Sequence, residues 1–102
     1  MDKRNDTLVY GVSGALEFLE ALSDKTRQRI LAIFVRLPEC RVTEIAARFE
    51  LSRPTISHHL SVLRKARVLV SRREGTEVYY SFNKDYVVGT LEKIRKRLEG
   101  YR

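Results

Sequence analysis

Residues 51–82 constrain the fold most, because a helix start and a pair of strands follow one another there without a break. Ser52 can accept a hydrogen bond from a free backbone amide at a helix start, and Pro54 has no amide that would need a partner. A helix is therefore predicted over about residues 53–66. Its apolar residues recur at i, i+4 and i+7, as one stripe that faces a core: Ile56, Leu60 and Leu63.

The opposite face of this predicted helix is polar. It carries Pro54, Ser57, His58, Ser61 and Lys65, with Thr55 and Val62 at its edge. Short hydrogen-bonding side chains come first along this face, and positive charge follows. This order suits a helix that enters the major groove of DNA by its N-terminal end, where small polar groups reach base edges and basic groups meet phosphates.

A second apolar stripe lies just before this helix and predicts another short helix. Its members are Val42, Ile45, Ala46 and Phe49. A link of about three residues, 50–52, would join the two helices, which is a helix-turn-helix arrangement. By itself the pattern also fits a helical hairpin that binds nothing.

A β-hairpin is predicted next, with strands over residues 68–73 and 77–82 and a turn at residues 74–76. Alternate residues of the second strand are apolar, namely Val78, Tyr80 and Phe82. Arg72 and Arg73 near the tip could simply keep a solvated edge strand from pairing with other chains. Directly after a helix-turn-helix, we favour a wing over about residues 68–82 that reaches phosphates or a minor groove.

The distribution of charge supports a nucleic-acid partner. The formal net charge is +7, with eight basic and eight acidic residues in the first fifty and twelve against five afterwards. The whole positive excess therefore lies after Glu50, on the predicted helix, the wing and the C-terminal helix. Not all of these residues need contact DNA. Four of them could instead serve to solvate the outer face of the last helix: Lys93, Arg95, Lys96 and Arg97.

A chain of 102 residues fits one domain with a modest core, so a leftover apolar stripe points to a partner. Two terminal helices, over about residues 13–22 and 85–99, carry such stripes. Their candidate interface residues are Leu16, Leu19, Val87, Leu91, Ile94 and Leu98. They would form a homodimer or pack on each other within one subunit, and we favour the dimer, which presents two reading helices to a pseudo-palindromic site.

Another helix is predicted between them, with Ser23 or Asp24 as its cap. It would bury Ile30, Ile33, Phe34 and Leu37. The expected fold is therefore mainly α with a small β-hairpin, in the order α-α-α-α-β-β-α. Residues 1–102 would form a single winged helix-turn-helix domain.

Three segments together resemble the ArsR/SmtB family of small bacterial winged-helix repressors: ALSDKTRQRIL, VTEIAARFELSRPTISHHLSVLRKA and RREGTEVYYSF. The resemblance covers about residues 15–82. It implies a homodimer built on the first and last helices, a recognition helix at about residues 54–66, and repression that a ligand or redox signal relieves. It also implies base contacts by Arg53, Thr55, Ser57 and His58, and backbone contacts by Ser61, Lys65, Arg72 and Arg73.

The sequence departs from this family at the metal sites. Arsenic-type members carry Cys-Val-Cys where this chain has residues 41–43, Arg-Val-Thr. Zinc-type members place Asp, His and Glu ligands on the last helix, which here has no histidine. The adjacent His58 and His59 suit a DNA contact and helix packing better than a metal, so we expect no metal and no cofactor.

We expect a dimeric, sequence-specific repressor that binds double-stranded DNA in the cytoplasm. The alternative is an interaction module that binds an acidic protein partner or nucleic acid without specificity. An enzyme is not expected, because the chain has no nucleophile elbow, phosphate loop or ligand cluster. A membrane-spanning segment and a signal peptide are not expected either. The single cysteine, Cys40, is a possible redox site, whereas the operator and the effector cannot be inferred.

Overall fold

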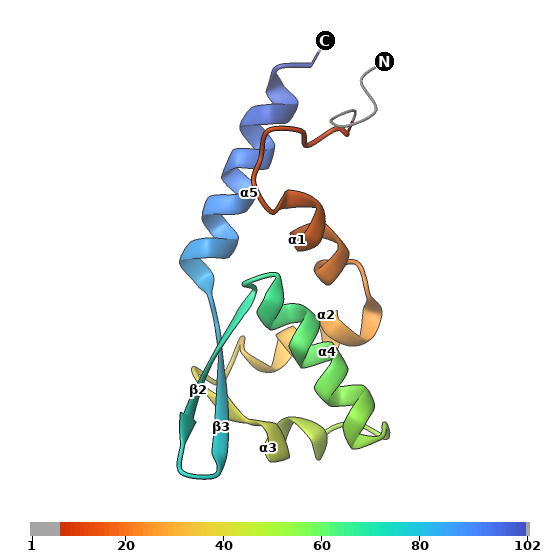
Figure 1. Cartoon of the computed structure of the whole chain (residues 1–102), viewed down its shortest axis with the longest axis vertical. Helices are drawn as coiled ribbons and strands as arrows, with labels where there is room; N and C mark the ends of the chain where they lie inside the picture. Colours follow the sequence, from red (N-terminus) through yellow and green to blue (C-terminus); the bar gives the residue numbers. More distant parts are fainter. Residues whose placement is uncertain (1–6, 102) are drawn as a thin grey trace.

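The computed structural model describes residues 7–101 and is mainly helical (Figure 1). Its helices are α1 (Ala15–Leu22), α2 (Lys25–Ile33), α3 (Val42–Ala46), α4 (Arg53–Lys65) and α5 (Lys84–Glu99). Its strands are β1 (Cys40–Arg41), β2 (Leu69–Glu74) and β3 (Glu77–Phe82). The predicted fold class is confirmed, and each predicted helix and strand is present.

One strand was not predicted. β1 lies at the edge of an antiparallel sheet with the order β1-β3-β2, and it pairs Cys40 with Tyr80. The element order is therefore α-α-β-α-α-β-β-α rather than the expected one. A strand of two residues is too short to show an alternating pattern, and it forms here because β3 offers it a partner.

The hairpin turn is one residue tighter than predicted. Glu74 pairs with Glu77 at the end of the ladder, so two residues, Gly75 and Thr76, make the turn. Gly75 has a φ of 62°, which a residue without a Cβ adopts at little cost. We call the hairpin β2–β3 the wing.

Two helix ends differ from the prediction. α1 begins at Ala15, because Gly14 precedes it with a left-handed φ of 75°. α3 ends at Ala46, and short turns over residues 47–49 replace the expected helix up to Phe49. The link between α3 and α4 is thus longer than expected, although Phe49 still packs against the core.

The core lies between the first four helices and the base of the wing. Its largest fully buried side chains are Phe18, Ile30, Ile45, Ile56, Leu60, Leu63, Val68 and Leu69. The apolar stripe predicted for α4 is fully buried, so the opposite face of α4 is directed outward. This packing orients the polar face of the helix.

The two ends of the described chain and the wing tip lie at opposite ends of the molecule (Figure 1). The N-terminal segment follows α5, and the Tyr101 hydroxyl donates a hydrogen bond of 3.2 Å to the Leu8 carbonyl. The wing tip and the start of α4 both lie at the other end of the molecule (Figure 1). Within residues 7–101, no helix has the length and apolar character needed to cross a bilayer.

Candidate nucleic-acid interface

The start of α4 is fixed by its cap. The Ser52 hydroxyl oxygen accepts a hydrogen bond of 3.2 Å from the backbone amide of Thr55, and it lies 2.8 Å from the Thr55 hydroxyl oxygen. Pro54 occupies the first turn, where its missing amide costs nothing. The predicted cap is therefore confirmed, and it holds the first polar side chains of α4 in one orientation.

Most of the predicted contact residues on α4 are exposed. These are Arg53, Thr55, Ser57, His58 and Lys65. Ser61 is only partly exposed, so less of its side chain can reach a ligand. Arg64, which the sequence reasoning left out, is also exposed beside Lys65 in the last turn.

The two wing arginines have different surroundings. Adjacent residues of a strand point to opposite faces of the sheet, so Arg72 and Arg73 do not share a face. Arg73 is exposed, and it makes no ion pair within residues 7–101. Arg72 instead pairs with Glu39 and Glu74, and its hydrogen bonds to Glu39 lower the pKa of the Glu39 carboxyl.

His59 points inward, as predicted for helix packing. Its side chain is 14% exposed, and its Nδ1 lies 3.1 Å from Nη1 of Arg27 and 4.0 Å from the Asp24 carboxylate. Burial lowers the pKa of His59, and the Asp24 carboxylate opposes this shift. His59 is therefore held as the neutral ring, which accepts the hydrogen bond from Arg27.

Arg27 links three helices, and the sequence reasoning missed it. Its Nε donates to the Ala21 carbonyl at 2.8 Å, and Nη2 donates to the Glu20 carbonyl at 3.1 Å. Both carbonyls belong to the last turn of α1, and the Glu20 carbonyl also accepts a hydrogen bond of 2.9 Å from the Ser23 hydroxyl. No local pattern indicates such contacts, because His59 is 32 residues away in the sequence.

No metal site is evident in the part of the chain that the structure describes. No group of three or more His, Cys, Asp or Glu residues there could hold an ion. The rings of His58 and His59 lie 5.9 Å apart at 53° and point into different surroundings.

The six residues predicted for a dimer interface divide into two groups. Val87 and Ile94 are buried within the subunit, each 8% exposed. The other four remain accessible: Leu16, Leu19, Leu91 and Leu98. Val88 is also exposed on α5, although the predicted stripe did not include it. An apolar surface thus remains on both terminal helices.

Cys40 lies on the inner side of β1 and is 1% exposed. Burial raises the pKa of its thiol, with a smaller contribution from the Glu44 carboxylate. Both the low exposure and the raised pKa reduce the amount of reactive thiolate. The position is therefore a poor one for a redox sensor.

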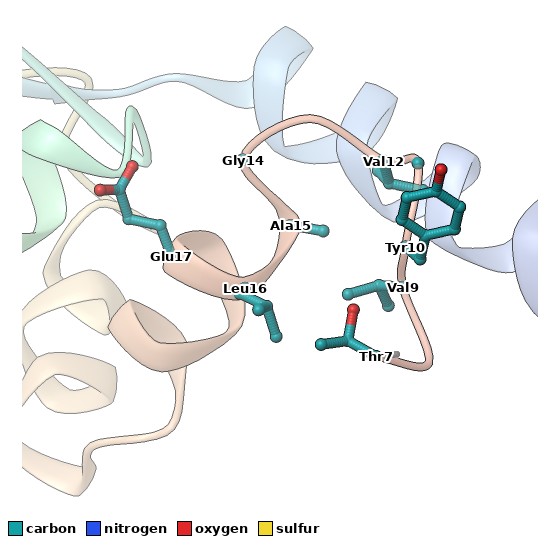
Figure 2. Close-up of a pocket in the computed structure, with 9 residues that line it drawn as sticks. Thr7, Val9, Tyr10, Val12, Gly14, Ala15, Leu16 and Glu17 are labelled. Carbon is teal, nitrogen blue, oxygen red and sulfur yellow. The ribbon is translucent and has the colours of Figure 1, made fainter. Parts of the chain in front are cut away.

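A pocket beside the start of α1 lies away from this surface. Figure 2 shows Thr7, Val9 and Leu16 around it, while Glu17 points away from these three side chains. The lining residues belong to residues 7–17 and include no histidine or cysteine. The pocket therefore has no evident connection with the exposed face of α4.

Residues 24–71 match the family described as bacterial regulatory proteins of the arsR family. Among curated proteins, the chain is 41% identical over 64 residues to the transcriptional repressor SdpR of Bacillus subtilis, a match that covers 63% of this chain and 70% of SdpR. It is 34% identical over 83 residues to a homologue of the transcriptional repressor SmtB from Synechocystis, covering 81% of this chain and 62% of that protein.

The solved structures agree with these matches. The transcriptional repressor PagR of Bacillus anthracis has a TM-score of 0.64 and 30% identity, with coverage of 78% of this chain and 90% of PagR. The family match runs from Asp24, the cap of α2, through α2, β1, α3 and α4 to Ser71 in β2. The chain therefore belongs to the arsR family of bacterial regulatory proteins, whose members are DNA-binding transcriptional regulators with a winged-helix fold.

Proposed function

We propose that this protein is a transcriptional repressor that binds a specific double-stranded DNA site as a homodimer. The single observation that carries the proposal is that the start of α4, which has an exposed polar face, lies at the same end of the molecule as the wing tip (Figure 1). A helix that offers this face to a major groove places the wing beside the neighbouring backbone. The relatives SdpR and PagR are both named transcriptional repressors, which supports the same function.

We propose that some residues of α4 contact base edges and others contact the phosphate backbone. Arg53, Thr55, Ser57 and His58 lie in the first turns, where side chains of a docked helix reach base edges. Ser61 and Lys65 lie further along and would contact the phosphate backbone, as would Arg73 of the wing. Ser61 would contribute least, because it is partly buried.

We also propose that the exposed apolar residues of α1 and α5 form the dimer interface. Leu16 is 53% exposed and Leu91 is 47% exposed, which is unfavourable in water unless a partner covers them. A two-fold dimer places two copies of α4 about one turn of DNA apart, or a multiple of it. The operator would therefore be an inverted repeat.

A salt titration of DNA binding tests this function. We would select a duplex from a random-sequence library with the wild-type protein, and compare it with a scrambled duplex of the same composition. Phosphate contacts make the affinity for both duplexes fall steeply with salt, whereas base reading produces a gap between them. Equal affinity for both duplexes would instead favour the interaction module without sequence specificity.

This function also implies a location. A repressor acts on chromosomal DNA, so we propose that the protein works in the cytoplasm of a bacterial cell. No effector is proposed, because nothing in the described residues identifies its chemistry.

A further inference from the structure

The side chain of Arg72 crosses the three-stranded sheet from β2 toward β1. Its guanidinium lies over the ring of Tyr79, with its central carbon 4.4 Å from the ring centroid. Beyond that ring it donates two hydrogen bonds of 2.8 Å to the two carboxylate oxygens of Glu39. The side chain thus runs from β2, over β3, to the residue that precedes β1.

The register of the sheet explains this path. Tyr79 is the cross-strand partner of Arg72 on one side and of Arg41 on the other. Paired residues share a face of the sheet, so these three side chains all lie on the face away from the buried Tyr80. Glu39 comes two residues before Arg41, at the edge of this same face.

The charge of Arg72 is already balanced. Besides Glu39, the Glu74 carboxylate at the wing tip accepts a hydrogen bond from Nη1 of Arg72. A bidentate pair with a carboxylate is a strong form of this contact, and stacking on an aromatic ring adds to it. A phosphate would have to displace two carboxylates to bind Arg72, whereas Arg73 has no such competitor within residues 7–101.

We propose that Arg72 is a positioning residue, which fastens the wing to the body of the domain through Glu39 so that Arg73 makes the phosphate contact of the wing. This inference rests on the proposed function and departs from the family resemblance, which implies a backbone contact by Arg72. The role of Arg72 is to hold the wing at a fixed angle to α4.

Removing Glu39 separates the two roles, because they predict opposite effects. If Arg72 positions the wing, Glu39→Ala loosens the wing and weakens binding to the selected duplex by about threefold to fivefold, the equilibrium effect of a well-formed exposed ion pair. If Arg72 contacts phosphate, Glu39→Ala frees its charge and tightens binding. Glu77→Ala is the matched control, because it removes the same charge from the adjacent strand β3 and loses only a 3.8 Å contact with Arg41.

The dependence of affinity on salt gives a second measurement. Arg73→Ala should reduce the slope by about one unit, as expected for one lost phosphate contact. Arg72→Ala should weaken binding and leave the slope unchanged. The proposal would be overturned if Arg72→Ala reduced the salt slope as much as Arg73→Ala does. It would also be overturned if the Glu39→Ala protein bound DNA more tightly than the Glu77→Ala protein.

Hydrogen exchange of the protein without DNA gives a third measurement, which does not depend on DNA binding. Arg72→Ala and Glu39→Ala should both speed the exchange of the backbone amides of β2 and β3, and Arg73→Ala should not. Wing exchange that stays at the wild-type rate in both variants would also overturn the proposal. If the wild-type protein binds neither duplex, or binds with an affinity that does not depend on salt, the proposed function fails. The exchange experiment would still test whether Arg72 and Glu39 fasten the wing.

Discussion

Arg27 and His59 are joined by a contact of 3.1 Å between Nη1 and Nδ1, which connects α2 to the middle of α4. Since the guanidinium can only donate, Nδ1 of His59 is the acceptor and its ring is neutral. The same guanidinium donates to the carbonyls of Glu20 and Ala21 at the end of α1. One side chain therefore sets the position of α4 relative to a terminal helix.

This contact predicts that the protein loses stability in mildly acidic solution. Burial lowers the pKa of His59, so the folded state binds a proton less readily than the unfolded chain does. The contribution to stability is complete above the unfolded value of about 6.5 and is lost as the pH falls from there through the lowered folded pKa. Urea unfolding at a series of pH values between about 7 and 5 measures it.

The variant His59→Gln is the control for this prediction. A glutamine can still accept a hydrogen bond from Arg27, but it does not titrate. The carboxyls of Asp24 and Glu44 also have lowered pKa values, and their unfolded values near 4 mean that their effect begins only below about pH 5. The prediction would be contradicted if the wild-type protein lost no more stability between pH 6.5 and 5 than the His59→Gln protein does.

His58 should contribute to sequence specificity. It is exposed on the outer face of α4, one residue from the inward His59. His58→Ala should weaken binding to the selected duplex by about 1–3 kcal/mol and leave binding to the scrambled duplex nearly intact. Fluorescence anisotropy with both duplexes measures the two affinities.

Lys65→Ala provides the contrast for His58. Lys65 is exposed in the last turn of α4, where a phosphate contact is proposed. Lys65→Ala should weaken binding to both duplexes alike and reduce the salt slope by about one unit. If His58→Ala behaves in the same way as Lys65→Ala, then His58 does not read bases.

The sequence predicted those parts of the fold that local patterns specify. The cap at Ser52, the stripe of Ile56, Leu60 and Leu63, and the alternation along β3 each involve residues close in the chain. β1 escaped prediction because it has two residues and exists only through its pairing with β3. The end of α3 also differed, since an apolar stripe does not distinguish a helix from turns whose amides, as at Arg48 and Phe49, donate to the carbonyl three residues back.

The site was predictable to a similar extent. Exposure of the polar face of α4 followed from its apolar stripe, whereas the set of proposed base contacts, which includes Arg53, came from the family resemblance. The partners of Arg72 and His59 could not be named in this way. Glu39 is 33 residues from Arg72, and Arg27 is 32 residues from His59, so only the folded chain brings each pair together.

Leu91 should be part of the dimer interface. It is 47% exposed on α5, between the buried Val87 and Ile94, so a charge there does not disturb the core of one subunit. Leu91→Glu would place a carboxylate inside the interface, where its desolvation opposes association. Sedimentation should therefore show monomers, and binding to an inverted repeat should weaken sharply because each subunit holds one half-site.

Lys93→Glu is the control for the dimer, because it also adds a negative charge to an exposed position of α5. It should leave the protein dimeric. Thermal unfolding of both variants checks that each still folds. A Leu91→Glu protein that sediments as a dimer would place the interface elsewhere.

Peroxide should not release the protein from DNA through Cys40. A thiol reacts as the thiolate, and Cys40 is 1% exposed with a pKa raised by burial. A disulfide between two subunits needs the sulfur atoms about 2.05 Å apart, which burial of Cys40 in each subunit opposes. We therefore expect iodoacetamide to label the folded protein slowly and the urea-unfolded protein at the rate of a free thiol. Peroxide-treated wild-type protein and Cys40→Ala should bind the selected duplex equally, whereas release of the wild type alone would establish a redox switch at this residue.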